Sequence, residues 1–158
     1  MAATEQLPWG RIVRQAVLAG LAASVLFQIY LWLTVVQPGH QSMPAFWQSS
    51  AAAVVVGKTA FASPVYAWLG LLIYLLVGIG WAGGYAYLAA LKPAFNQTWP
   101  ISGVVYGLIV YLLMALILFA GNAFHYPPSP NAFLNLAIAH GVFFGLPIAY
   151  FVYAMRAQ

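Results

Sequence analysis

The chain has 158 residues, of which 65% are hydrophobic and only 4% are charged. A soluble domain carries about a quarter charged residues, so this composition excludes a soluble globular protein and indicates one embedded in a membrane. The net charge of +4 comes from scattered Lys and Arg that form no basic patch for nucleic acid, and the lack of cysteine excludes disulfides and thiolate chemistry.

Four apolar runs are long enough to cross a bilayer as helices, which takes about 20 residues each. They cover residues of about 13–36, 65–91, 101–123 and 132–155. In lipid every backbone amide needs an internal partner, so runs of this kind form helices. The predicted fold class is all-α: a four-transmembrane-helix bundle that forms a single integral membrane domain over residues 1–158.

The first run is followed by an unusually long connection. This run continues to Val36, beyond the length of a signal-peptide core, so we expect a retained membrane helix. The connection from Gln37 to Pro64 is too long for a bare turn. Its centre, Ala45 to Ala62, has no proline and is rich in Ala and Val, but it is too short and too polar to span. We expect an extra helical segment outside the membrane or at its interface, with an ordered loop as the alternative.

The positions of the cations predict an orientation. With four spans, Arg11, Arg14, Lys92 and Arg156 fall on one side of the membrane, and only Lys58 falls on the other. Cytoplasmic loops carry the excess of Lys and Arg in membrane proteins. Both termini are therefore predicted to be cytoplasmic.

Small residues four positions apart recur in the predicted helices. The second run contains Gly80 and Gly84, and the third contains Gly103 and Gly107. Helices in lipid associate through close backbone contacts, which small residues at this spacing permit. We expect these four glycines to face neighbouring helices, and the helices to be closest in the cytoplasmic half and to splay toward the outside.

Two further features of the fourth run affect its shape and chemistry. Pro147 has no amide hydrogen for the carbonyl of Phe143, so a bend is expected between these residues. His140 is the only histidine well inside an apolar run, since His40 and His125 lie in connections. The spacing of the three histidines matches no metal-binding motif, and the single acidic residue lies outside the runs, so no catalytic residue and no metal ligand is predicted.

Four polar side chains are expected at similar depths in the bundle, with Gln28 and His140 in its outer half and Tyr111 near its centre. At a rise of about 1.5 Å per residue, Gln28, Tyr74, Tyr111 and His140 come within about one turn of the same level. We expect Gln28 and His140 to point into the bundle, with Tyr74 or Tyr111 completing a layer, and these four are the candidate ligand-binding residues. A purely structural layer would bond internally and leave no cavity, whereas a binding site would show a pocket that opens outward and touches His140.

Three segments carry a resemblance to a known group of proteins. They are Ala19-Gly20-Leu21-Ala22-Ala23, Gly80-Trp81-Ala82-Gly83-Gly84-Tyr85 and His140-Gly141-Val142-Phe143-Phe144-Gly145. Together with the long connection, they resemble the YagU-like four-helix membrane proteins of bacteria. The resemblance implies a location in the plasma (inner) membrane and carries over no catalytic motif.

The leading functional hypothesis is a non-enzymatic multi-pass membrane protein that acts as an accessory or interaction subunit of a membrane complex. Its expected partners are the lipid bilayer and either other membrane subunits or further copies of itself, with no nucleic acid and no required cofactor. Two alternatives stay open. One is a small transporter or channel for a neutral solute, and the other is a haem-, quinone- or pigment-binding membrane protein that uses His140.

Overall fold

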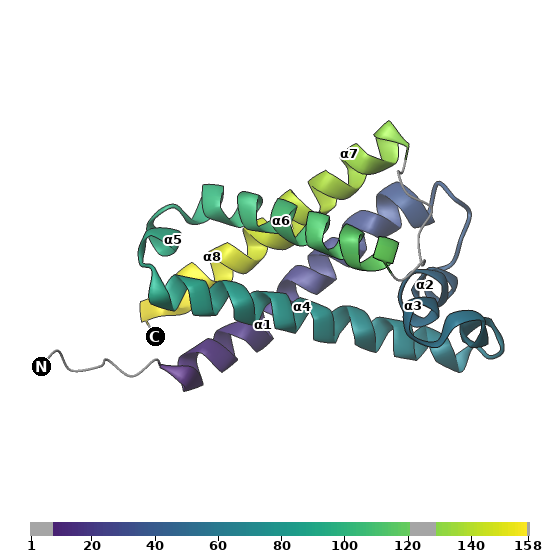
Figure 1. Ribbon diagram of the computed structural model, residues 1–158, viewed down its shortest axis with the longest axis horizontal. Helices are drawn as coiled ribbons and strands as arrows, with labels where there is room; N and C mark the ends of the chain where they lie inside the picture. Colours follow the sequence, from purple (N-terminus) through teal and green to yellow (C-terminus); the bar gives the residue numbers. More distant parts are fainter. Residues whose placement is uncertain (1–7, 121–128, 158) are drawn as a thin grey trace, which may run out of the picture.

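The computed structural model describes residues 8–120 and 129–157, and over these residues the chain is helical with no strand (Figure 1). Four of its helices are long and apolar enough to cross a membrane. These spans are α1 (Trp9–Leu31) with the π-helical η1 (Trp32–Val36), α4 (Val65–Leu91), α6 (Trp99–Ala120), and a fourth made of α7 (Pro130–Ile138), the π-helical η4 (Ala139–Gly145) and α8 (Leu146–Ala154). The all-α, four-helix fold class is confirmed.

The span boundaries differ by a few residues from those expected. The first span starts at Trp9 rather than near residue 13, and the fourth starts at Pro130 rather than near residue 132. Proline occupies the N-cap or first turn in each case, where its missing amide costs nothing. Ser129 adds a cap to the fourth span, because its side chain accepts a hydrogen bond from the backbone amide of Ala132. The expected end of the third span near residue 123 lies outside the described residues.

The long connection is helical, as expected. It contains α2 (Met43–Trp47), the π-helical η2 (Gln48–Ala52), α3 (Ala53–Val56) and the 3-10 helix η3 (Gly57–Phe61). Gly57 ends the α-helical part with a φ of 60°, a conformation that glycine adopts without steric cost. The amide of Gln48 then donates to the carbonyls of Ala60 and Ser63, at 3.1 and 2.9 Å, and holds the turn back toward α4.

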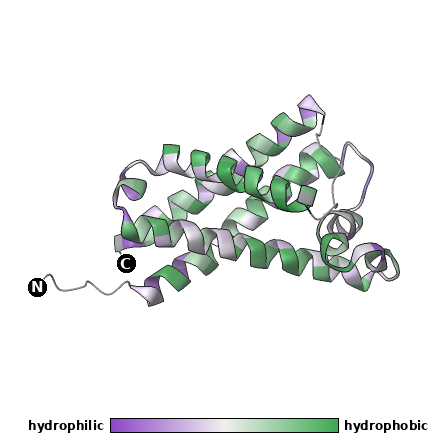
Figure 2. Ribbon diagram, in the orientation of Figure 1, coloured by the Kyte–Doolittle hydropathy of each residue, from purple (hydrophilic) through white to green (hydrophobic). Residues whose placement is uncertain are grey.

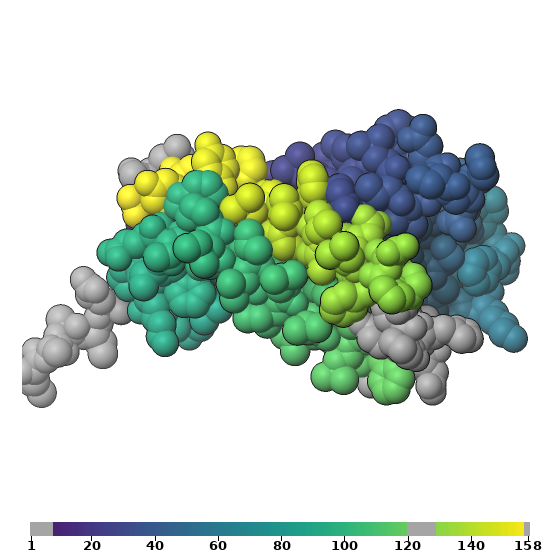
Figure 3. Space-filling view, turned by 90° about the horizontal axis from the view of Figure 1, so that it is seen from above, coloured from purple at the N-terminus to yellow at the C-terminus, as the bar shows by residue number. Residues whose placement is uncertain are grey.

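The four spans are arranged so that the fourth lies between α1 and α6 (Figure 3), while α1 packs against α4 on its other side. The start of α1, the short α5 (Ala94–Gln97) and the end of α8 lie together at one end, which we call the terminal end (Figure 1). The helices α2 and α3 lie at the opposite end, which we call the connection end. Figure 2 shows hydrophobic residues along the spans and hydrophilic ones mostly at the two ends.

Glycines bring the backbone of α6 against the fourth span. A Cβ atom built on Gly103 would lie 2.6 Å from the Cβ of Ala149, and one built on Gly107 would overlap the carbonyl oxygen of His140. Between α1 and α4, a Cβ on Gly20 would lie 2.6 Å from the Cα of Ile79. These contacts leave no room for a side chain, so the helices are held at the short separation that small residues allow.

The expectation is wrong for Gly80 and holds only in part for Gly84, which lies near Tyr106 of α6. Both are exposed; a Cβ on Gly80 would meet nothing within 4 Å, and one on Gly84 would meet only the hydroxyl of Tyr106, at 2.9 Å. The buried small residues of α4 are Gly78 and Ala82 instead. Because α4 is apolar on all sides, glycine spacing alone does not show which face meets its neighbours.

The effect of Pro147 takes the form of a π-helical stretch immediately before it. In η4 the backbone amide of Leu146 bonds the carbonyl of Gly141, five residues earlier rather than four. Pro147 is the second residue of α8. A proline removes one amide donor, and a local change of hydrogen-bond register accommodates that loss.

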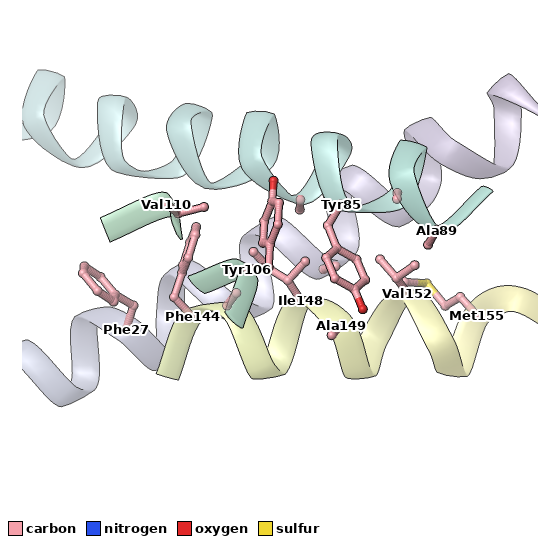
Figure 4. Packing of buried hydrophobic residues seen from close by; sticks show 14 of the residues in the cluster. Phe27, Tyr85, Ala89, Tyr106, Val110, Phe144, Ile148, Ala149, Val152 and Met155 are labelled. Carbon is pink, nitrogen blue, oxygen red and sulfur yellow. The ribbon is translucent and has the colours of Figure 1, made fainter. Parts of the chain in front are cut away.

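Tyrosines fill the space between the spans toward the terminal end (Figure 4). The Tyr106 hydroxyl donates to the carbonyl of Trp81 at 2.6 Å and so joins α6 to α4. The Tyr85 hydroxyl lies 2.7 Å from that of Ser102, and the rings of Tyr85 and Tyr106 meet edge to face at 5.2 Å. The terminal half of the bundle is therefore densely packed.

We predict that Gly107→Ala lowers the thermal stability of the detergent-solubilised protein, because the new methyl group meets backbone that cannot move aside. Gly80→Ala is the matched control. It adds the same methyl group to open space and gains the better helix propensity of alanine, about 1 kcal/mol in soluble helices, so its melting temperature should be unchanged or slightly higher. Equal melting temperatures for the two variants would contradict the packing described here.

Candidate functional site

A cavity of about 530 Å³ lies among the spans in the half toward the connection end. Its walls come from all four spans and from the helical connection. Gln28, Tyr74, Tyr111 and His140, the four side chains singled out in the sequence, all line it. The structure thus brings them together around a space rather than into a closed layer.

His140 enters the cavity from η4. Its ring lies among aromatic rings, with centroids 4.8 Å from Phe27, 5.1 Å from Tyr111 and 6.2 Å from Phe144. Its Nδ1 atom lies 2.8 Å from the carbonyl oxygen of Leu136. A carbonyl can only accept, so Nδ1 carries the hydrogen and, in the neutral ring, Nε2 is an unprotonated acceptor.

Gln28 presents a fixed donor. The indole Nε1 of Trp47 donates to its Oε1 at 3.1 Å, which settles the orientation of the amide because an indole cannot accept. Gln28 is buried, and its Nε2 atom has no hydrogen-bond partner among the described residues. Ser24, one turn earlier on α1, also lines the cavity, and its buried hydroxyl likewise lacks a partner there. Buried polar groups are normally satisfied, so two such groups at one cavity call for an explanation.

Tyr74 and Tyr111 play different parts in the wall. The Tyr74 hydroxyl donates to Ser50 at 2.9 Å, and Ser50 in turn donates to the carbonyl of Phe46 at 2.5 Å. The Tyr74 and Phe46 rings stack at 6.2 Å. Tyr111 makes ring contacts with His140 and with Phe133, the latter at 5.4 Å. Tyr74 thus secures the connection, and Tyr111 supports the histidine.

Gln28, Tyr74 and His140 are not bonded to one another as a structural layer requires. Gln28 and Tyr74 bond the connection through Trp47 and Ser50, whereas His140 bonds its own helix. The sequence reasoning missed Trp47 and Ser50. Both residues lie in or next to the polar stretch that made the connection unfit to cross the membrane. That pattern predicted a position outside the membrane but not which spans the connection contacts.

The other side-chain amide among the described residues of the cavity wall belongs to Asn135, and both its oxygen and its nitrogen form hydrogen bonds. The Tyr30 hydroxyl donates to Asn135 Oδ1 at 2.6 Å, and Asn135 Nδ2 donates to the Thr34 hydroxyl at 3.2 Å. This pair of bonds joins the first span to the fourth near the connection end. Asn135 therefore has a structural role, and the free hydrogen-bonding capacity among the described lining residues lies with Ser24, Gln28 and His140.

The cavity is bordered by Trp81 toward the terminal end and by exposed apolar side chains elsewhere. Toward the terminal end Trp81 lines it, and the bond from Tyr106 to the Trp81 carbonyl joins α4 and α6 there. Its lining also includes apolar side chains that are well exposed, Val55 at 64% and Ile117 at 56%. Since Ile117 belongs to a span, this side of the cavity communicates with lipid if the spans cross a membrane.

The electrostatic character of the cavity is uniform. Over the part of the chain that the structure describes, its lining contains no Asp, Glu, Lys or Arg, and most of its side chains are apolar. Among the described residues no group of three His, Asp or Glu side chains could hold a metal ion. A charged guest would lose its hydration without gaining a counter-charge, so the cavity suits a neutral one.

We predict that Trp47→Phe loosens the connection, because it leaves a second polar atom of Gln28 unpaired at a cost of about 1–3 kcal/mol. Amide hydrogens of α2 and η2 should exchange faster with solvent, as measured by mass spectrometry. Trp68→Phe is the control, since Trp68 is 68% exposed and does not line the cavity. Unchanged exchange in Trp47→Phe would show that the indole bond does not hold the segment in place.

Comparison with known proteins supplies no relative for this chain. It matches no protein-family model, no curated protein and no solved structure. The resemblance to the YagU-like proteins therefore stays a prediction, and the case for a function rests on the residues of the cavity.

Proposed function

We propose that this protein is a non-enzymatic multi-pass membrane protein that holds a neutral, lipophilic small molecule in the cavity of its connection half. The observation that carries the proposal is the buried, unpaired amide of Gln28 on the wall of an otherwise apolar cavity of about 530 Å³. Small-molecule sites are typically of about 300–1,000 Å³, mostly apolar, with a few placed polar groups.

The binding proposal fits the described residues better than a channel does. A channel for a polar solute needs a polar path through the bundle. Toward the terminal end the spans are instead joined by Trp81, Tyr85 and Tyr106, with the Tyr106 hydroxyl committed to a backbone carbonyl. The cavity therefore has the form of a pocket rather than a pore.

Haem is a weaker fit than an uncharged molecule. Haem carries two propionate groups, and the lining holds no cation to pair with them. Among the described residues His140 is the one histidine on the wall, so this part of the chain offers a single axial ligand. A quinone or pigment without charge meets neither difficulty.

An accessory role remains part of the proposal. A protein that binds a lipophilic molecule without transforming it can supply that molecule to, or hold it beside, a partner subunit in the same membrane. The partner, or a second copy of this chain, is proposed from the sequence and has no observed contact surface.

The proposal is tested by native mass spectrometry of the full chain after mild extraction from membranes. We expect a bound species of constant mass and near-equimolar amount that is not a bulk phospholipid, and a stoichiometric protein partner would support the accessory role as well. Recovery of the protein alone, or with phospholipids in the proportions of the membrane, would refute ligand binding.

We predict that Ala115→Phe sharply reduces the amount of bound species, because the new ring occupies the cavity. Ala115 lines the cavity on α6, and the adjacent Leu116 is 62% exposed and does not. Leu116→Phe is therefore the matched control and should retain the species. Melting temperatures of both variants would be measured alongside, and full retention by a folded Ala115→Phe protein would place the ligand elsewhere.

A further inference from the structure

We infer that the cavity selects a lipophilic molecule that carries a hydroxyl group, an alcohol or a hydroquinone, over the corresponding ether or quinone. The hydroxyl hydrogen would be donated to Nε2 of His140, and a hydroxyl oxygen would accept from the side-chain amide of Gln28. The inference rests on the proposed function and specifies the chemistry of its ligand.

The donor side of this recognition is Gln28. Its Oε1 is occupied by the Trp47 indole, so the side chain cannot rotate to exchange oxygen for nitrogen without breaking that bond. The amide hydrogens of Nε2 are left without an acceptor in a buried position. An oxygen atom of the ligand is the group that satisfies them.

The acceptor side is His140. The bond of Nδ1 with the Leu136 carbonyl fixes the hydrogen on that nitrogen and leaves Nε2 with a lone pair. Phe27 of α1 and Tyr111 of α6 contact the ring from the two helices that pack against η4. These contacts set the orientation of the ring before a ligand binds. An ether or a quinone offers only acceptors and cannot bond this lone pair.

The pairing of one donor with one acceptor points to a hydroxyl, which can act as both. A carboxylic acid or an amine would have to give up its charge to enter, at a cost in free energy, because no charged side chain of the described lining could pair with it. An acyl chain of a bulk phospholipid would fill the apolar part but leave both polar groups unpaired. Prenyl-type alcohols and prenylated hydroquinones share the required chemistry.

The test compares matched ligands on the full-length protein in nanodiscs, with binding followed by quenching of tryptophan fluorescence. Farnesol is compared with farnesyl methyl ether, and a short-chain ubiquinol is compared with its quinone. We expect the hydroxyl member of at least one pair to bind about tenfold more tightly, the size of one buried hydrogen bond. A preference in only one pair shows whether the cavity binds a prenyl-type alcohol or a prenylated hydroquinone.

Three variants test whether His140 causes the preference for the hydroxyl compound. His140→Phe keeps an aromatic ring but has no lone pair, so it should bind both members of a pair equally. His140→Gln restores an acceptor and should recover part of the preference. His40→Asn, at an exposed position with a φ of 52° that asparagine tolerates, should behave as the unmodified protein.

The outcomes separate the inference from the proposed function. Equal affinities within both pairs for the unmodified protein would overturn the hydroxyl inference while leaving ligand binding intact. Absence of binding by all four compounds, together with no bound species in native mass spectrometry, would overturn both. If His140→Phe does not fold, His140→Leu, which also lacks an acceptor, takes its place, and an unchanged preference in either variant would overturn the role of His140.

Discussion

The backbone contact of α6 with η4 is the constraint on which the remaining structure depends. At Gly107 the two helices are so close that a methyl group would overlap the carbonyl of His140. Helices in lipid gain little from hiding apolar surface from each other, so this closeness supplies the packing that holds them. The same contact places the His140 backbone, and with it the imidazole, at a set position on the cavity wall.

The cavity exists because the four interfaces of the bundle are not alike. Small residues form the interface between the fourth span and α6 and the interface between α1 and α4. In contrast, the larger side chains of Trp81 and Tyr106 lie between α4 and α6. Large bridging side chains hold helices farther apart than glycines do. Toward the connection end this separation is covered by the helical connection, whose Trp47 and Ser50 bond the first and second spans.

The sequence predicted what depends on composition and length. Apolar runs located the spans, the absence of proline over residues 45–62 indicated a helix, and the helical rise placed Gln28, Tyr74, Tyr111 and His140 at one level. It failed where orientation matters. In α4, which is apolar on every face, nothing in the sequence indicated that Gly80 faces open space. Contacts across many residues, such as Trp47 with Gln28, leave no periodic trace in the chain.

The distribution of unpaired polar groups favours a binding site over a purely structural layer. In a structural polar layer the buried polar groups form hydrogen bonds with other protein groups. Asn135 and Tyr74 do so here, with Tyr30 and Ser50 respectively. Gln28 and Ser24 do not, since each leaves a buried polar atom unpaired at the cavity. A ligand that formed hydrogen bonds with such atoms would offset the cost of their burial, which is the basis of the proposed preference for a particular head group.

The most direct test of this account is nitrogen-15 NMR of histidine-labelled protein in bilayers, with the His140 signals assigned by their loss in His140→Gln. The account predicts a neutral ring with the hydrogen on Nδ1, and a change in the Nε2 shift when a hydroxyl-bearing ligand is added but not when its ether is added. A hydrogen on Nε2, or an Nε2 signal that ignores both ligands, would contradict it.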